Sequence, residues 1–363
     1  MRHASAFSRM HTSFVNGVVR MRGAALAGLF LLSSLACAQS ATPPAQLQTI
    51  TVTGEQPGPG LWKVSKGDHV LWILGTVSPL PRDIQWKSKE LDERIAQSQE
   101  LLAGEGVGLS ADAGFFGTLA LLPSLIGVKN NPDGKTLDQV LPPELYERWV
   151  AAKRKYIGHS NWAERLRPVF AAIKLYDAAM DDNHLTGSDF VRKQVRSDAR
   201  RAHLAIVTAQ VNYTIKNPRA AVKRFKASQI SDVGCFSKTL DSIDTDLVNM
   251  TARANAWAVG DIDALRKLPR SDQWNVCTQE VSESGIAHEL GLSDAAARLR
   301  AAWLDEAKKA LDKNASTVAV VSMRSLLDPN GKLAQLKALG YTIKAPDGDT
   351  TDQEVSQTAT VLP

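Results

Sequence analysis

The sequence predicts a fold of the α/β to α+β class, in which mixed β-sheets pack against helices. Three observations favour this class. Two strand-like segments stand near the start, at 61–64 and 70–76. Long amphipathic helices follow in the middle of the chain. Near the end, a strand, a helix and a second strand succeed one another over residues 317–343.

The first elements are two strands, joined by a turn at Lys66-Gly67-Asp68. A helix is expected from Ser88, because Leu91 and Ile95 recur at helical spacing. Residues 101–103 either continue this helix or begin a strand that leads to Glu105. The glycine-rich residues 104–108 are interpreted as a loop, since no lysine follows that would bind a phosphate.

Helices dominate the next part of the chain. Residues 114–128 are apolar throughout but too few to span a bilayer, so a buried helix is expected there. Pro142 and Pro143 begin another helix, which directs Leu145 and Trp149 inward. Ser160 is expected to cap the following helix, with a kink at Pro168.

The last third of the chain returns to strands. Residues 203–208 are expected to form a strand. Residues 237–265 and 293–311 are expected to form two long amphipathic helices. Residues 317–321 form a buried strand, and a helix that begins after 328 is stopped by Gly340 before a strand at 341–343.

The basic charge of the chain belongs to its first residues. The formal net charge is +5. Four arginines and no acidic residue precede the expected cleavage point described below, so the remainder carries 5 − 4 = +1. They are Arg2, Arg9, Arg20 and Arg22. A nearly neutral protein has no electrostatic footprint for nucleic acid, which excludes that class of partner.

Residues 1–38 have the pattern of a signal peptide. Basic residues precede an apolar run over 24–32, and Ala36-Cys37-Ala38 supplies a small-residue cleavage site after Ala38. Translation starts at Met1 or at Met21. We expect a periplasmic or secreted protein without a transmembrane helix in the mature chain. The alternative is a lipoprotein modified on Cys37, although Ser34 stands where that signal prefers leucine.

The mature chain has the composition of one domain between two polar ends. Residues 39–60 are expected to be a flexible linker, 61–343 the domain and 344–363 a disordered tail. Two cysteines remain, Cys235 and Cys277. In an oxidising compartment we expect them to form a disulfide, and two buried thiols are the alternative.

Three segments together resemble the TraB/GumN (Tiki-like) family. They are Leu-Trp-Lys-Val at 61–64 with Leu-Trp-Ile-Leu-Gly-Thr-Val at 71–77, then Trp-Ala-Val-Gly-Asp at 257–261, and Val-Ala-Val at 318–320 with residues 330–343. The resemblance implies the family's architecture, which is shared with erythromycin esterase and ChaN-like proteins.

The resemblance also implies a metal site, held by two Gly-x-x-His motifs and a glutamate. Two imidazoles and a carboxylate can hold a divalent ion that activates water. The first motif stands here as Gly75-Thr76-Val77-Ser78, and the second as Val321-Ser322-Met323-Arg324. Serine is a poor ligand and arginine cannot be one, since it stays protonated. Glu105, or Glu100 under a shifted alignment, is the remaining carboxylate.

No other motif replaces this site. His288 ends a literal Gly-x-x-His sequence, but in a polar turn before a helix, and His69 is expected on the surface. His159, His184 and His203 are scattered.

Two functions remain open from the sequence. The first is a non-catalytic binding or accessory protein of the envelope, with no cofactor, whose partner is a protein, a peptide or a saccharide. In that case Arg324 pairs with Glu105 or binds a carboxylate or sugar acid. The alternative is a peptide hydrolase with a divalent metal at a shifted site, or a metal-free site around Ser78, Glu105 and Arg324.

Overall fold

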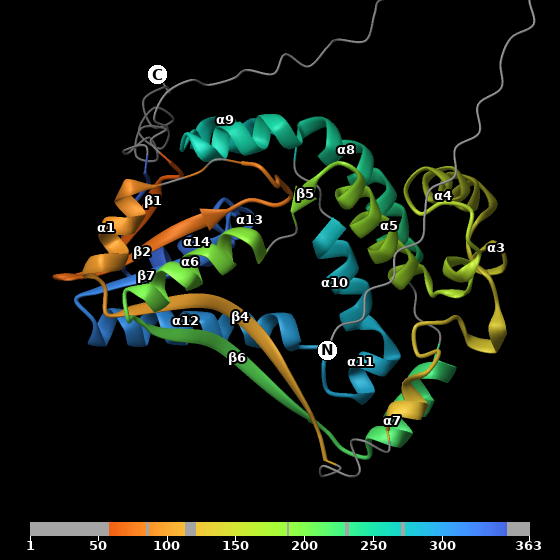
Figure 1. The fold of residues 1–363 in the computed structure, drawn as a ribbon. Coiled ribbons are helices and arrows are strands. Elements are labelled where there is room, and N and C mark those ends of the chain that lie inside the picture. The colour runs from red at the N-terminus through yellow and green to blue at the C-terminus, as the bar shows by residue number, and fades with distance from the viewer. Residues whose placement is uncertain are drawn as a thin grey trace, which may run out of the picture. The chain divides into compact units, whose positions relative to one another are not determined.

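A mixed sheet of six strands forms the centre of the fold (Figure 1). The computed structural model describes residues 58–84, 86, 88–112, 121–186, 189–228, 232–269 and 273–346. The strands lie in the order β6-β4-β7-β2-β1-β8. Their bounds are β1 Leu61–Lys66, β2 His69–Thr76, β4 Glu100–Ala111, β6 Ala205–Ile215, β7 Ser316–Ser322 and β8 Thr342–Lys344. The fold class expected from the sequence is confirmed.

The four strands β6, β4, β7 and β2 run parallel, whereas β1 is antiparallel to both β2 and β8. The five central residues of β7 are all buried, as expected for a parallel strand that helices cover on both faces. Because the strands are parallel, their carboxyl ends lie at one edge of the sheet. Ligand sites of open α/β sheets form outside this edge.

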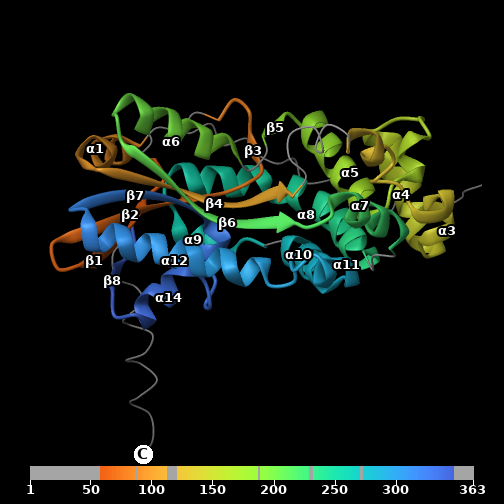
Figure 2. The same cartoon turned by 90° about the horizontal axis from the view of Figure 1, so that it is seen from below.

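Helices cover both faces of the sheet, as Figure 2 shows. One face carries α1 and α6, and the other carries α12 and α14. Their bounds are α1 Lys89–Gln97, α6 Asp189–Arg201, α12 Ala295–Lys313 and α14 Lys332–Ala338. The helix expected from Ser88 is α1, and the Ser88 hydroxyl caps it by accepting a hydrogen bond from the Leu91 amide at 3.1 Å. Leu91 and Ile95 are buried beneath it.

A second hydrophobic core lies among helices away from the sheet. It is built from α3 Leu137–Val140, α4 Pro143–Tyr156, α5 Pro168–Asp182 and the first half of α8 Val233–Ala258. The second half of α8 belongs to the core of the sheet, where Trp257 is fully buried. The helix α8 therefore takes part in both cores.

Shorter elements connect these layers. They are β3 Leu80–Pro81, β5 Leu185–Thr186, η1 Leu122–Leu125, η2 Pro132–Gly134, η3 Trp162–Arg165, α7 Pro218–Ala227, α9 Ile262–Lys267, α10 Gln273–Glu283, α11 Gly285–Glu289 and α13 Met323–Leu326. No helix among the described residues is both long enough and apolar enough to cross a bilayer.

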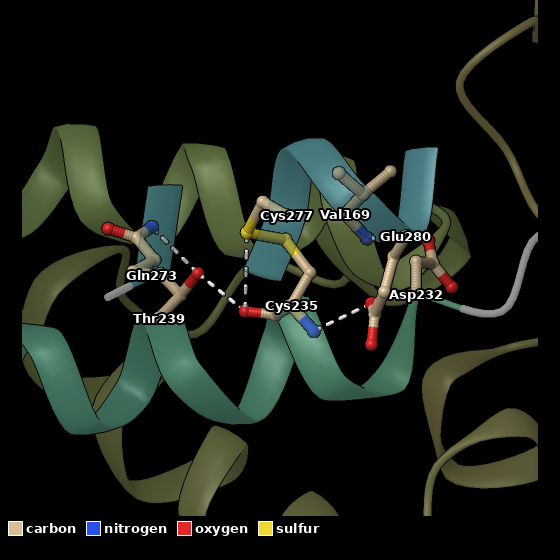
Figure 3. The surroundings of a disulfide bond; sticks show 7 residues. All are labelled: Val169, Asp232, Cys235, Thr239, Gln273, Cys277 and Glu280. Atoms are coloured by element: carbon tan, nitrogen blue, oxygen red, sulfur yellow. Dashed lines mark hydrogen bonds between the residues drawn. A yellow bond between two sulfur atoms is a disulfide. The ribbon is translucent and has the colours of Figure 1, made fainter. Parts of the chain in front are cut away.

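A disulfide joins α8 to α10 (Figure 3). The predicted bond between Cys235 and Cys277 is confirmed, with the two Cα atoms 4.5 Å apart. Glu280, one turn after Cys277, accepts a hydrogen bond from the Cys235 amide at 2.8 Å. The carboxylate thus satisfies a free amide in the first turn of α8 and holds the same two helices together.

Several expected elements differ in the structure. The apolar segment 114–128 is not a buried helix where it is described, because residues 122–125 form a single 3-10 turn with Leu122 and Leu125 exposed. Residues 113–120 lie outside the described residues. Pro168 does not kink a helix but begins α5, since proline fits the first helical position. The glycine-rich segment 104–108 lies within β4 rather than in a loop.

Other boundaries shift for local reasons. The long helix expected over 237–265 is two helices, α8 and α9, because Gly260 takes a positive φ of 75° after α8. The strand expected at 203–208 is the longer β6. The last strand, β8, reaches Lys344, one residue into the expected tail. The expected signal peptide, residues 39–57 of the expected linker and the tail from residue 347 lie outside the described residues.

Candidate functional site

The first and second motif segments meet at the carboxyl edge of the sheet. Gly75 is the register partner of Val321, and Thr76 is the partner of Ser322. The Thr76 hydroxyl also donates a hydrogen bond to the Val321 carbonyl at 3.4 Å. Two segments almost 250 positions apart are therefore brought side by side by the parallel pairing of β2 and β7.

Close packing explains the glycine of the first motif. A Cβ atom at Gly75 would lie 2.6 Å from the Met323 side chain and 2.9 Å from Trp62. The Gly75 carbonyl accepts a hydrogen bond from the Trp257 indole at 2.7 Å. The strand end is thus held from one side by α13 and from another by α8. Glycine serves packing here and leaves no open space beside the strand.

The residues that stand in place of the two histidines are both exposed. Ser78 follows β2 and precedes Pro79, and its side chain is exposed. Arg324 lies in the first turn of α13, which begins where β7 ends, and is also exposed. Ser322 caps this short helix, because its hydroxyl accepts a hydrogen bond from the Ser325 amide at 3.3 Å.

The glutamate of the site is bound by a lysine. Glu105 Oε1 lies 2.8 Å from Lys332 Nζ. The Lys332 side chain is 7% exposed and the Glu105 side chain 30%. The same ammonium group lies 5.2 Å from the centre of the Trp303 ring, so an aromatic face also stabilises its charge. Lys332 begins α14, and Trp303 belongs to α12.

The structure gives Glu105 the partner Lys332, and the expected pairing of Arg324 with Glu105 stays a prediction. The register of β4 shifts between Leu102 and Glu105, and the Glu105 side chain reaches the helices on the α12 and α14 face of the sheet. Lys332 reaches the carboxylate from that face. Glu100, the alternative under a shifted alignment, begins β4 at the opposite edge and accepts a hydrogen bond from Asn314.

Arg324 acts electrostatically on a buried polar network between α5 and α8. Tyr176 donates a hydrogen bond to Asp246 at 3.3 Å, and Arg253 donates to the same carboxylate at 3.2 Å. A second Arg253 nitrogen donates to the Pro269 carbonyl at 2.8 Å. Asp246 and Arg253 are both buried. Their mutual pairing offsets the cost of removing two charges from water.

The electrostatics of this network keep Tyr176 protonated. Burial raises the pKa of Tyr176, and the charge and hydrogen bond of Asp246 raise it further. The positive charges of Arg253 and Arg324 lower the same pKa. Arg324 therefore lies within electrostatic reach of the phenol. We name Ser78, Tyr176, Asp246, Arg253 and Arg324 the strand-end site.

These residues do not fit a divalent metal. Serine and arginine replace both imidazoles, and the remaining carboxylate is already bound by an ammonium group. Within the described ranges, no three His, Cys, Asp or Glu side chains are close enough to hold an ion together. His288 is exposed on the short helix α11. His69 is half-buried, and its Nδ1 lies 2.7 Å from the Leu311 carbonyl.

A comparison with protein families gives one match. The sequence matches the model of the TraB/PrgY/gumN family over residues 60–345, which is more than half of the chain. The chain belongs to the TraB/PrgY/gumN family. The match begins just before β1 and ends just after β8, so it covers the whole sheet. No curated protein and no solved structure matches the chain significantly.

The contacts of several site residues could not be predicted from the sequence. Lys332 follows Asn330-Gly331 at the start of a helix, where a lysine is ordinarily exposed. Asp246 and Arg253 are seven positions apart, on the same side of α8, and this spacing places them together. Nothing in the sequence connects them to Tyr176, because that contact depends on how α5 packs on α8.

Proposed function

We propose that this TraB/PrgY/gumN family chain is an exported protein of the cell envelope that binds a ligand and does not hydrolyse peptides with a metal. The observation that carries the proposal is the buried ammonium of Lys332 on Glu105. A carboxylate that ligates a metal must offer its oxygens to the ion. Here a protein cation already holds one of them, and the imidazoles that would compete for an ion are replaced.

The binding role rests on Arg324. Its guanidinium stands exposed at the carboxyl edge of parallel strands, where ligands of α/β proteins are bound. Arginine recognises carboxylates through two parallel hydrogen bonds. Tyr176 and Arg253 both donate to Asp246, so Arg324 is the group that supplies positive charge to a ligand. We therefore propose a ligand that carries a carboxylate, such as a peptide C-terminus or a sugar acid.

Export is proposed from the pattern of the first 38 residues. The arginines before residue 24, the apolar run that follows and the small residues before Gln39 form a secretory leader. The disulfide between α8 and α10 is consistent with an oxidising compartment. We expect the mature protein to begin at Gln39. Mass measurement of intact protein from a periplasmic fraction tests this start, and a lipid-modified Cys37 would contradict it.

Metal analysis tests the absence of metal-dependent catalysis. Protein purified without chelators is expected to contain no stoichiometric transition ion and to show no heat of binding on titration with Mn²⁺ or Zn²⁺. One tightly bound ion per chain that is needed for peptide hydrolysis would overturn the proposal and favour the hydrolase alternative. A triple variant, Ser78→His with Arg324→His and Lys332→Met, restores both imidazoles and frees Glu105, and serves as the positive comparison.

Ligand titration tests the binding role. Glucuronate and a short peptide with a free C-terminus are the probes, and the same peptide with an amidated C-terminus is the matched control. Arg324→Met is expected to weaken binding by about tenfold or more, which is the loss of a charge-assisted hydrogen bond pair. Arg154→Met, at an exposed arginine of α4, is expected to leave the affinity unchanged. Equal affinities of the two variants would contradict a role for Arg324.

A further inference from the structure

An apolar surface stands exposed at η1. The side chains of Leu122, Leu125 and Ile126 are 58%, 44% and 76% exposed. Leu121, next to them, is buried and fixes the turn to the body of the protein. Single exposed apolar residues are ordinary on protein surfaces. Three large apolar side chains within five positions form a patch of the kind that marks an interaction site.

A basic helix lies directly beside this patch. The helix α7 contacts η1, and it also contacts η2. In Figure 1, α7 lies where the long pair of strands β4 and β6 ends. Residues 216–227 contain five basic side chains and no acidic one, namely Lys216, Arg219, Lys223, Arg224 and Lys226. Lys216, Arg219 and Lys223 are exposed, whereas Arg224 pairs with Glu289 at 2.9 Å.

The segment around η1 adds little opposing charge. Residues 121–135 contain Lys129 and Lys135 against one acid, Asp133. The apolar side chains are therefore bordered by positive charge on η1 and on α7. We name the exposed residues Leu122, Leu125, Ile126, Lys216, Arg219 and Lys223 the η1–α7 surface.

We infer that the η1–α7 surface docks on an anionic lipid bilayer. Apolar side chains bordered by lysine and arginine match a membrane interface, where the apolar groups enter the acyl boundary and the cations meet the headgroups. A soluble polyanion would use the basic residues but gain nothing from Leu122, Leu125 and Ile126. An apolar protein partner would use the apolar side chains but not the exposed charges of Arg219 and Lys223. An anionic lipid surface uses both sets.

Vesicle co-sedimentation tests the inference with the full chain. Vesicles of phosphatidylcholine alone are compared with vesicles that also contain phosphatidylglycerol. Parent and variants share one N-terminus, so that the apolar residues of the leader contribute equally to every comparison. We expect binding to the phosphatidylglycerol vesicles that weakens as salt is raised.

Two pairs of variants separate the two contributions. Leu125→Ser with Ile126→Ser removes apolar surface, and Arg219→Gln with Lys223→Gln removes charge. The glutamine pair is expected to weaken binding by about 25-fold, since each basic residue near a lipid surface contributes roughly fivefold. The serine pair is expected to weaken binding by about tenfold, because it removes apolar surface that would enter the acyl boundary. The controls are Leu339→Ser, at an apolar residue that is 55% exposed directly after α14, and Lys193→Gln on α6. Both are expected to bind as the parent does.

Three results would overturn the inference. The first is equal binding to both kinds of vesicle. The second is vesicle binding that the serine pair leaves unchanged while dextran sulfate competes fully, because this would show a site for soluble polyanions. The third is a self-associated parent that the serine pair makes monomeric without a change in vesicle binding, because the apolar patch would then be an interface between copies of the chain.

Discussion

The burial of a charged group determines how much the loss of its partner lowers the free energy of unfolding. Lys332 is the clearest case. Its ammonium is almost fully buried, whereas the carboxylate of Glu105 is partly in water. Glu105→Gln leaves the buried cation without its counter-charge and is expected to lower the free energy of unfolding by about 1–3 kcal/mol. Lys332→Met keeps the contact with Trp303 and is expected to cost less, because only the more exposed partner is left unpaired.

Urea unfolding of the single and double variants measures this coupling. The matched control is the exposed pair of Lys66 and Asp312, in which both side chains are more than half exposed. Asp312→Asn is expected to change the free energy of unfolding by about 0.5 kcal/mol or less. If Glu105→Gln is no more destabilising than Asp312→Asn, the Lys332 ammonium does not need this carboxylate.

A second buried carboxyl group predicts a pH dependence. Burial raises the pKa of Asp232 from 3.8 to about 6, although the Val169 amide, which donates to it at 2.8 Å, and Arg167 both act in the opposite direction. Between about pH 4 and pH 6 the folded state keeps a proton that the unfolded chain has released. The free energy of unfolding therefore falls as pH rises through this window, by on the order of 2–3 kcal/mol.

Asp232→Asn is expected to remove this slope, because asparagine can still accept the Val169 hydrogen bond but carries no charge. Chemical unfolding at several pH values between 4 and 7 measures the difference. Asp68→Asn, in the exposed turn before β2, is the control for loss of a carboxylate. An unchanged slope in Asp232→Asn would show that another group carries the pH dependence.

At the scale of elements, the disulfide fixes α10 to α8. It closes a loop of 42 positions, and the loss of loop entropy in the unfolded chain stabilises the fold by about 4 kcal/mol if the bond is unstrained. The double variant Cys235→Ser with Cys277→Ser is expected to unfold at a lower denaturant concentration by this amount. The hydrogen bond from the Cys235 amide to Glu280 remains in the variant, so α10 is expected to stay docked on α8 in the folded state.

Two measurements check the disulfide. Mass spectrometry after alkylation, with and without reduction, is expected to show no free thiol among these two cysteines in the native protein. Unfolding of the parent in the presence of a reductant is expected to match that of the double variant. Equal stability with and without the bond would contradict a structural role for it.

The elements that the sequence predicts well are those whose periodicity is strong and local. The strands at β1, β2 and β7, and the helices α1, α4, α12 and α14, have clear apolar patterns and clear ends. The errors occur where a proline or a glycine interrupts an apolar periodicity. Pro168 is compatible with a kink inside a helix and with the first position of one, and the structure has the second. Gly260 ends a helix inside a stretch whose amphipathic pattern continues past it. Composition alone made 114–128 resemble a core helix, although Leu122, Leu125 and Ile126 face outward.

The site was predictable only as far as its strands. The pairing of Gly75 with Val321 follows from the order of the motifs and the parallel sheet. The partner of Glu105 was not predictable, because it depends on the register shift in β4 and on the position of α14. Side-chain partners at the end of a strand depend on packing between distant segments, which residue types and spacing do not specify.

At the scale of the whole molecule, α8 joins the two hydrophobic cores. Phe236, Leu240 and Ile243 are buried in the helical core, and Ala254 and Trp257 in the core of the sheet. The helix is continuous over 26 residues, so helical order at one end favours helical order at the other end. We therefore expect the described domain to unfold in one cooperative transition despite its two cores.

A variant in the helical core tests this coupling. Ile243→Ala leaves the sheet untouched and is expected to cost about 2–4 kcal/mol, as for other large-to-small changes in a core. Hydrogen exchange in low denaturant, read by mass spectrometry, follows peptides from β2 and β7 separately from peptides of α4 and α5. If α8 couples the cores, exchange of the sheet peptides accelerates by the same factor as that of the helical peptides. Faster exchange confined to α4 and α5 would mean that the helical core opens alone, with Trp257 and the carboxyl edge of the sheet still in place.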